Sequence, residues 1–210
     1  MKLLSIIQAA GWPIWPLLAC SVVALALIIE RLLSLRPHLI VPADLLDQVL
    51  AASQNQLPSA DTVQQLQAHS VLGQLLASGF KSLQHNPYIN DADLRQSIET
   101  AGRQAAHTLE KRLTTLATIA SAAPLLGLLG TVIGMIDIFG SQSPGAANPA
   151  QLAQGISMAL YNTAFGLIVA IPTLMFWRYF RAQVDGFVME LETQAERFAR
   201  HLQHLRTRLR

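Results

Sequence analysis

The chain has 210 residues, of which 51% are hydrophobic and only 13% are charged. Soluble domains are about one quarter charged, so this composition points to a membrane protein. A formal net charge of +2 argues against a general nucleic-acid-binding surface. With one cysteine, Cys20, an internal disulfide is excluded and the redox compartment stays open.

Three stretches without any charge carry most of the apolar excess. They cover residues 3–29, 113–136 and 138–177. About 20 apolar residues cross the hydrocarbon core of a bilayer, so each stretch is long enough to span it. We expect transmembrane helices at about 12–29, 113–139 and 152–177.

The first apolar stretch has two interpretations. Lys2 precedes it, and "LLAC" at 17–20 resembles a lipoprotein cleavage box, as in a signal peptide. However, a glycine and two prolines interrupt the helix that a signal peptide needs, and the apolar run continues through Ile29. We therefore favour a retained span, with Trp12 and Trp15 as interfacial anchors.

An apolar stripe leads from the polar middle of the chain into the second span. Asn90 and Asp93 favour a helix start. The stripe consists of Leu94, Ile98, Ala101, Ala105 and Leu109. Because its spacing of three and four continues into Leu113, one long helix is expected to hold both the stripe and the span. A shorter helix is expected around Val63–Phe80.

The tail after the third span repeats apolar residues every seven positions. One set is Val184, Leu191, Phe198 and Leu205, and the other is Val188, Ala195, Leu202 and Leu209. A stripe sustained over four heptads needs a partner helix. The sequence leaves open whether that partner is in the same chain or in another subunit.

The distribution of Lys and Arg predicts the topology. Of fifteen such residues, seven lie in 30–112, seven in 178–210 and none in the turn 140–151. Positive residues favour the cytoplasmic side, so the N-terminus and the turn are expected outside. The predicted fold is all-α, with spans two and three extended into a cytoplasmic helical domain. The segments are 1–30 with the first span, 31–112 in the cytoplasm, 113–139, the turn 140–151, 152–177 and the C-terminal helix 178–210.

Small residues recur at spacings of three and four in spans two and three. The second span has Ala120, Pro124, Gly127, Thr131 and Gly134, and the third has Ala159, Thr163, Gly166, Ala170 and Thr173. Such faces let helices pack closely in lipid. Thr131 and Thr163 fall at similar depth on helices that run in opposite directions. Each hydroxyl either bonds its own helix backbone or lines a narrow lumen in a ring of identical subunits.

Other polar residues of the spans have weaker interpretations. Asp137 lies near the outer end of span two, where a solvated residue is favoured over a proton carrier. Asn162 is expected to point off the small face toward another helix, and Ser157 and Tyr161 are candidates for interhelical hydrogen bonds. Pro124 and Pro172 are expected to kink their helices. We find no motif for an enzyme, a cofactor or a metal ion.

Two segments carry a family resemblance. "ASAAPLLGLLGTVIGMIDIF" at 120–139 and "GISMALYNTAFGLIVAIPTLMFWRYF" at 155–180 resemble the ExbB/TolQ/MotA proton-channel family, ExbB members most of all. "GWPIWPLLACSVVALALIIERLLSLR" at 11–36 resembles the ExbB first span. The resemblance implies a pentameric ring in a bacterial inner membrane around an ExbD-like dimer, powering a TonB-like protein. It also implies that Thr131 and Thr163 line the lumen.

One position departs from the family pattern. Many members carry a glutamate five residues before the threonine of span three, where this chain has Met158. The resemblance then implies that the protonatable group comes from the aspartate of the single-span partner. A TolQ-like role in the envelope and a non-conducting scaffold stay as alternatives. A solute permease is disfavoured because three spans without broken-helix repeats offer no substrate cavity.

Overall fold

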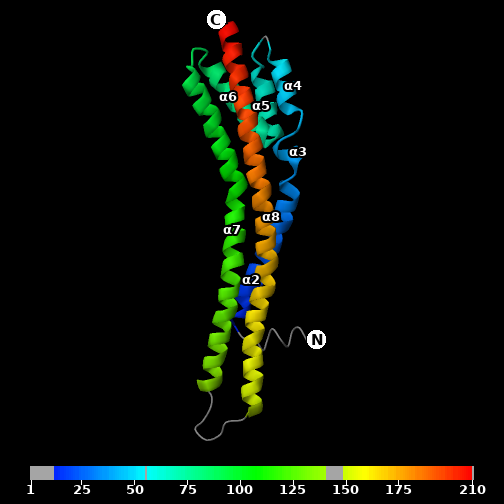
Figure 1. The fold of residues 1–210 in the computed structure, drawn as a ribbon, viewed down its shortest axis with the longest axis vertical. Coiled ribbons are helices and arrows are strands. Elements are labelled where there is room, and N and C mark those ends of the chain that lie inside the picture. The colour runs from blue at the N-terminus through cyan, green and yellow to red at the C-terminus, as the bar shows by residue number, and fades with distance from the viewer. Residues whose placement is uncertain (1–11, 55, 141–148, 210) are drawn as a thin grey trace. The chain divides into compact units, whose positions relative to one another are not determined.

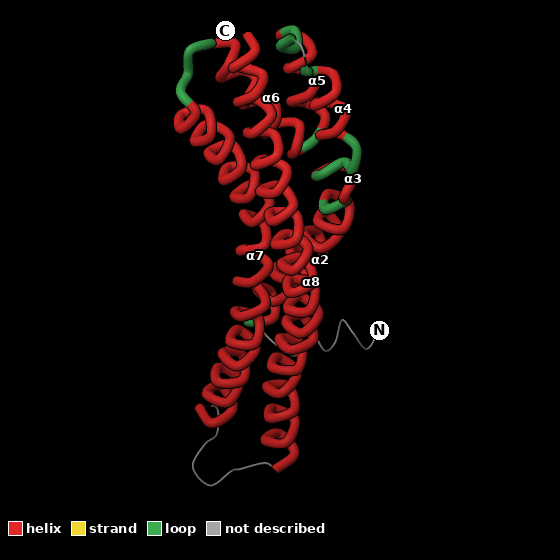
Figure 2. Tube along the Cα trace, turned by 45° about the horizontal axis from the view of Figure 1, so that its top comes forward, coloured by secondary structure: helices red, strands yellow, loops and turns green. Residues whose placement is uncertain are grey.

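The computed structural model describes residues 12–54, 56–140 and 149–209, and the side chains of residues 151, 154, 158, 208 and 209 lie outside this description. Regular structure in the described ranges is helical, without strands (Figure 2). The helices are α2 (Ile14–Ser34), α3 (Pro37–Ile40), α4 (Leu45–Ala52), α5 (Ala60–His69), α6 (Val71–His85), α7 (Asp91–Gly140) and α8 (Pro149–Leu209). Within them, α2, α7 and α8 are long and apolar enough to cross a membrane. The predicted all-α fold with three such helices is confirmed.

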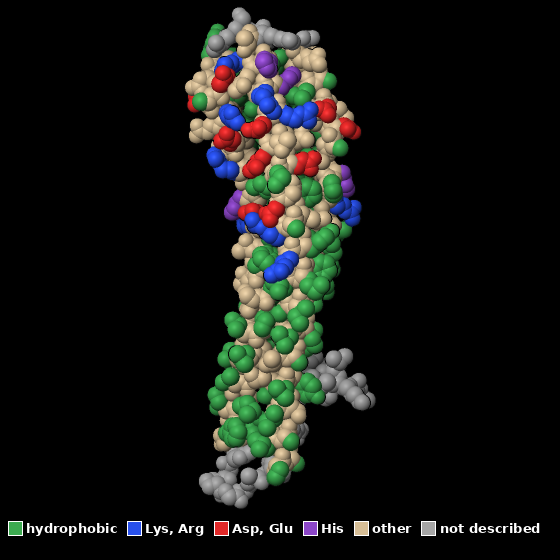
Figure 3. Space-filling view, viewed as in Figure 1, with side chains coloured by type: hydrophobic (Ala, Val, Ile, Leu, Met, Phe, Trp, Pro, Cys, Tyr) green, Lys and Arg blue, Asp and Glu red, His purple; other side chains and the backbone are tan. Residues whose placement is uncertain are grey.

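The chain forms two compact units. One comprises the described parts of Met1–Glu30 and Arg112–Tyr179, and the other comprises Arg31–Lys111 and Phe180–Arg210. We call them the apolar unit and the charged unit. On the face drawn in Figure 3, acidic and basic side chains gather mainly on the charged unit, whereas hydrophobic side chains cover the apolar unit.

The long helix α7 begins where the sequence predicts. The side chain of Asn90 accepts a hydrogen bond from the Asp93 backbone N–H at 2.7 Å and donates one to Asp93 Oδ2 at 2.8 Å. The first of these bonds satisfies one backbone donor that the first helical turn leaves unpaired, and the second joins the two side chains. From there α7 continues without a break to Gly140, as Figure 1 shows. The prediction of one helix through the stripe and the second apolar stretch is therefore confirmed.

The first heptad set of the tail is buried inside the same chain. Its members, Val184, Leu191, Phe198 and Leu205, are at most 2% exposed. Phe198 packs edge-on against Phe80 of α6, with ring centroids 5.0 Å apart. A Cβ at Gly79 would lie 2.7 Å from Phe198 Cε1, so the glycine makes room for the ring. At Phe198 the partner helix that the sequence left open is therefore α6 of this chain.

The expected single helix around Val63–Phe80 is wrong in one respect, because Ser70 divides it into α5 and α6. Ser70 adopts an extended conformation, and its hydroxyl accepts a hydrogen bond from the Gly73 N–H at 3.0 Å. Serine stabilises a helix start in this way. A Cβ at Gly73 would lie 2.1 Å from the carbonyl oxygen of Leu66, so glycine is required for this tight junction.

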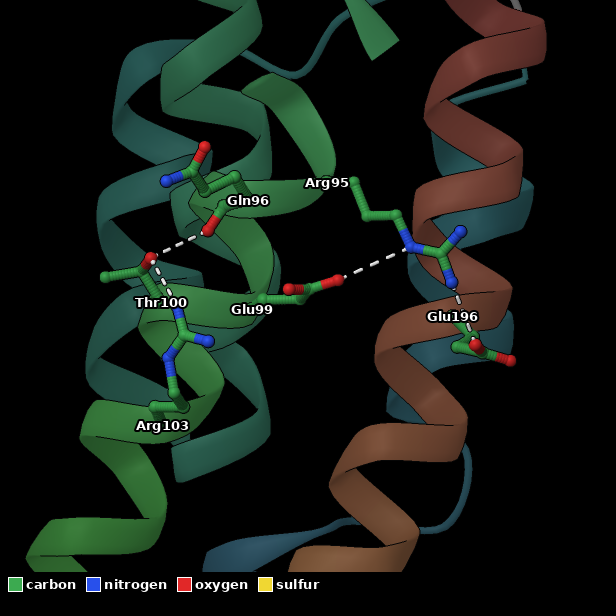
Figure 4. Close-up of polar contacts among 6 residues, drawn as sticks. All are labelled: Arg95, Gln96, Glu99, Thr100, Arg103 and Glu196. Atoms are coloured by element: carbon green, nitrogen blue, oxygen red, sulfur yellow. Dashed lines mark hydrogen bonds and ion pairs between the residues drawn. The ribbon is translucent and has the colours of Figure 1, made fainter. Parts of the chain in front are cut away.

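Ion pairs connect α8 to its neighbours in the charged unit. Figure 4 shows Arg95 of α7 between Glu99 of its own helix and Glu196 of α8, at 3.5 Å and 3.0 Å. The other pairs to α8 are Arg181–Glu110, Arg197–Asp47 and Arg206–Asp91. Exposed pairs of this kind contribute at most about 1 kcal/mol each. They therefore set the register of the helices more than their stability.

A polar contact in the charged unit joins α8 to the segment after α4. Ser53 is fully buried after the end of α4. Its hydroxyl donates to the carbonyl oxygen of Val49 at 2.6 Å and lies 3.0 Å from Nε2 of His201 on α8. The contact joins two segments far apart in the sequence.

Candidate functional site

Three helices meet in the core of the apolar unit. Leu17 and Ala24 of α2, Ile119 and Ala123 of α7, and Val169 and Ala170 of α8 form one buried cluster. Cys20 is half-buried and packs against this cluster, which fits the expectation of a small apolar role. Small side chains dominate the cluster on α7 and α8, so these two backbones can approach each other closely.

Two glycines mark the close approach. A Cβ at Gly127 of α7 would lie 2.7 Å from the carbonyl oxygen of Asn162 and 3.0 Å from Cα of Thr163. On the opposite helix, a Cβ at Gly166 would lie 2.6 Å from the carbonyl oxygen of Ala123. The atoms in the way belong to backbone and cannot rotate aside. Gly127 and Gly166 are therefore required by the contact between α7 and α8.

Thr131 and Thr163 lie at this contact. The Thr163 hydroxyl donates to the carbonyl oxygen of Gly127 at 3.3 Å, across the two helices. The Thr131 hydroxyl donates to the carbonyl oxygen of Leu128 at 2.6 Å, within α7. Helix geometry pairs the Thr131 backbone N–H with the same Gly127 carbonyl. The Thr163 hydroxyl thus contacts α7 one helical turn before Thr131, whereas the Thr131 hydroxyl bonds its own helix.

The remaining small residues differ in their surroundings. Gly134 faces Ala159, since a Cβ on the glycine would lie 3.3 Å from the alanine Cβ. Buried residues of the set are Ala120, Ala159, Gly166, Ala170 and Thr173, and Pro124 is half-buried. Thr173 bonds its own helix, donating to the Val169 carbonyl oxygen at 2.6 Å. These faces meet one another within the chain, and lining of a lumen by them stays a prediction.

Asn162 points toward another helix, as the sequence predicted. It is 2% exposed. A Cβ at Gly130 would lie 2.8–2.9 Å from its side-chain atoms, so the Asn162 amide occupies the space that Gly130 leaves free on α7. Gly130 lies three residues after Gly127, so the two glycines lie on the same side of α7. Asn162 adds a buried amide one residue before Thr163.

Other candidates lie away from the contact. Asp137 is exposed, as is Tyr161. Ser157 is also exposed, and it donates to the Ala153 carbonyl oxygen of its own helix at 2.9 Å. The side chain of Met158 lies outside the described residues. Pro124 and Pro172 are inside α7 and α8, where each removes one backbone donor from its helix.

The arrangement supplies hydroxyl and amide groups between two helices rather than a reactive centre. Hydroxyl oxygens can accept hydrogen bonds from water or from an acid on a neighbouring chain, but they do not hold a proton at neutral pH. In the described ranges, no cluster of three His, Cys, Asp or Glu residues is placed to hold a metal ion. The hydroxyl and amide groups of the site can form hydrogen bonds, but binding a proton would require an acid that they do not supply.

Comparison with known proteins identifies the family. A family model described as the MotA/TolQ/ExbB proton channel family matches residues 67–193. The chain belongs to the MotA/TolQ/ExbB proton channel family. The resemblance inferred from the sequence is thereby confirmed. This is a family of transport proteins and not of enzymes, and together with the apolar helices it indicates a multi-pass protein of the bacterial inner membrane.

Several family members are similar over most of the chain. An ExbB-like 3 putative biopolymer transport protein of Synechocystis is 36% identical, covering 83% of each chain. The biopolymer transport protein exbB1 of Vibrio cholerae is 31% identical, covering 88% of this chain and 82% of its own. The Tol-Pal system protein TolQ of Pseudomonas aeruginosa is 33% identical, covering 63% of this chain and 58% of its own.

Proposed function

We propose that this chain is an ExbB-like subunit of a proton-channel stator in the inner membrane. With an ExbD-like single-span partner it uses the proton-motive force to energise a TonB-like protein for outer-membrane transport. The observation that carries the proposal is the Thr163 hydroxyl, which donates to the Gly127 carbonyl oxygen of α7 one helical turn before Thr131, in a chain of this family. The hydroxyl oxygens of Thr131 and Thr163 would be acceptors for an acid or water in a lumen.

The assembly is part of the same proposal. Five copies would form a ring whose lumen is lined by Thr131 and Thr163 and holds the helices of two partner chains. The placement of Lys and Arg supports a periplasmic N-terminus and a cytoplasmic C-terminus. Residues 138–177 contain no charged residue, and Met158 stands where many members have a glutamate. The proton carrier would therefore be the aspartate of the partner.

Substitution of the threonines tests the proposal. The full chain and an ExbD-like partner are reconstituted in vesicles, and proton entry under an imposed potential is followed with an internal pH dye. We expect Thr131→Val and Thr163→Val to slow proton entry roughly tenfold or more, since a lost polar contact costs about 1–3 kcal/mol. Thr131→Ser and Thr163→Ser keep the hydroxyl and should retain most of the flux.

Thr118→Val is the matched control. Thr118 is an exposed threonine of α7 whose hydroxyl bonds its own helix at Thr114, at 2.9 Å, so its loss should leave the flux unchanged. Wild-type flux in the double valine variant would rule out the threonine assignment. No flux in the wild-type complex would instead favour a non-conducting scaffold.

A TolQ-like task is the second candidate, because a Tol-Pal system protein is also among the relatives. It keeps the same proton path and changes the protein that is energised. Deletion strains distinguish the two tasks. An ExbB-like protein is needed for growth in iron-limited medium, whereas a TolQ-like protein is needed for growth in detergent.

A further inference from the structure

Exposed leucines continue on α2 and α3 beyond the first charged residues of the chain. Leu32, Leu33 and Leu39 are 47%, 55% and 44% exposed. All three follow Glu30 and Arg31, the charges that end the first apolar stretch of the sequence. Three exposed leucines within eight residues are not expected on a water-facing surface, so the group that covers them needs to be identified.

Both charges have partners within the protein, and Arg31 is buried whereas Glu30 is partly exposed. Arg31 is only 6% exposed, and its Nη1 donates to the carbonyl oxygen of Leu109 at 3.2 Å. Glu30 forms an ion pair with Arg112 of α7. Both charges thus have partners within the protein. Paired or hydrogen-bonded charges of this kind are tolerated at membrane depth, whereas unpaired ones facing lipid are costly.

The length of α2 is consistent with lipid around its last turn. Trp15 is 65% exposed near the start of the helix, as expected for an interfacial anchor. Helical hydrogen bonding continues to Leu35, whose N–H bonds the Arg31 carbonyl oxygen at 2.9 Å. At 1.5 Å per residue, Trp15 to Leu35 covers about 30 Å, the thickness of the hydrocarbon core. A span that stopped at Ile29 would reach only about 21 Å from Trp15.

We propose that the last turn of α2 and the short helix α3 form a contact with the bilayer surface. In this contact Leu32 and Leu33 face the edge of the hydrocarbon core, and the Leu39 side chain inserts into the core. Arg36 and His38 are exposed between and beside these leucines. The Arg36 guanidinium suits the phosphate of an anionic headgroup, which it can bind with two N–H groups. The occupant is thus anionic phospholipid.

The continuity of the exposed stripe along α2 favours lipid, rather than a second protein chain, as the occupant of this surface. On α2 the exposed residues Val22, Leu25, Ile29 and Leu32 follow one another at spacings of three and four, so they share one stripe. They belong to a helix that is apolar and long enough to cross a membrane. The same stripe continues to Leu32, past the two partnered charges, and Arg36 follows after the helix ends, in the extended conformation that precedes α3.

Site-directed fluorescence tests this contact. Cys20 is the single cysteine, so Cys20→Ala gives a background for one labelled cysteine at a time. Full-length Leu33→Cys and Leu39→Cys carry an environment-sensitive dye in phosphatidylethanolamine vesicles that contain nitroxide-labelled phosphatidylglycerol. Met189→Cys is the matched control, because Met189 is an apolar residue of α8 that is 69% exposed in the charged unit.

We expect lipid nitroxides to quench the dye at Leu33 and Leu39 severalfold more than at Met189. Arg36→Gln should weaken the preference of the Leu39 site for phosphatidylglycerol over phosphatidylcholine by up to about fivefold, and Arg36→Lys should keep it. Equal quenching at all three positions would overturn the proposal. So would a disulfide-linked dimer of Leu33→Cys without lipid quenching, because the leucines would then face a second copy. None of these outcomes depends on proton flux.

Discussion

Gly127 and Gly166 lie where the backbones of α7 and α8 contact each other. The nearest atoms to an added Cβ are carbonyl oxygens, at 2.7 Å and 2.6 Å. Helical glycines usually weaken a helix by about 1 kcal/mol relative to alanine. Here that cost is offset by the close contact, which also sets the distance across which the Thr163 hydroxyl reaches the Gly127 carbonyl.

We expect Gly127→Ala and Gly166→Ala to destabilise the protein. Overpacking of about 1–3 kcal/mol exceeds the gain of about 1 kcal/mol in helix propensity. The measurement is the midpoint of thermal unfolding of the full chain in detergent. Gly186→Ala is the control, since nothing lies within 4 Å of its added Cβ, and it should be neutral or stabilising. If all three variants unfold together, the close contact does not limit stability.

Much of this residue-scale geometry follows from the spacing of small residues. Spacings of three and four place Gly127 and Thr131 on one face of their helix and Thr163 and Gly166 on one face of theirs. The sequence could not reveal which partner each face meets, because a small face packs equally well on the same chain or on another. The position of Asn162 was predicted only as pointing toward another helix, and the spacing did not identify Gly130 as its neighbour.

At the scale of elements, the junction between α5 and α6 shows how one side chain ends a pattern. Ser70 terminates α5 and begins α6, and its hydroxyl replaces a helical acceptor for the Gly73 N–H. The apolar spacing runs on across the junction, so periodicity alone predicted a single helix. The signal for the helix break is local and consists of a serine three residues before a glycine. The stronger apolar periodicity outweighs it in a prediction from sequence.

Removal of this cap gives an element-scale prediction. Ser70→Ala should lower the free energy of unfolding by about 1 kcal/mol, because the Gly73 N–H is buried without its acceptor. Ser59→Ala is the comparison, since Ser59 caps α5 at an exposed site with a longer contact of 3.3 Å to the Thr62 N–H. We expect its effect to be smaller. Equal losses in chemical denaturation would show that burial of the cap is unimportant.

At the scale of the whole molecule, α7 and α8 each contribute to both units. In the apolar unit, small residues allow close contact between the backbones of α7 and α8. The charged unit instead has a core of large side chains such as Phe80 and Phe198. The sequence predicted long helices from unbroken periodicity. The sequence suggested that the helix ending at Phe80 could cover part of the tail, as Phe80 does at Phe198, but heptads alone identify an apolar stripe and not its partner.

Because the two units have different cores, shortening a core side chain should destabilise one unit and not the other. Phe198→Ala should destabilise the charged unit by about 3–5 kcal/mol, the usual cost of removing a buried phenyl ring. Hydrogen exchange of the full chain should then show faster exchange in 71–85 and 91–111, with 112–140 unchanged. Met189→Ala, at a 69% exposed site, should leave all of these segments protected. Faster exchange throughout after Phe198→Ala would mean that the two units unfold as one.

The contact between Ser53 and His201 fixes the direction of one hydrogen bond. The single hydroxyl proton of Ser53 is engaged with the Val49 carbonyl oxygen, so the imidazole donates from Nε2 to the serine oxygen. One hydroxyl thus ends α4 through its proton and ties that end to α8 through its oxygen, so a substitution of Ser53 would remove both contacts at once.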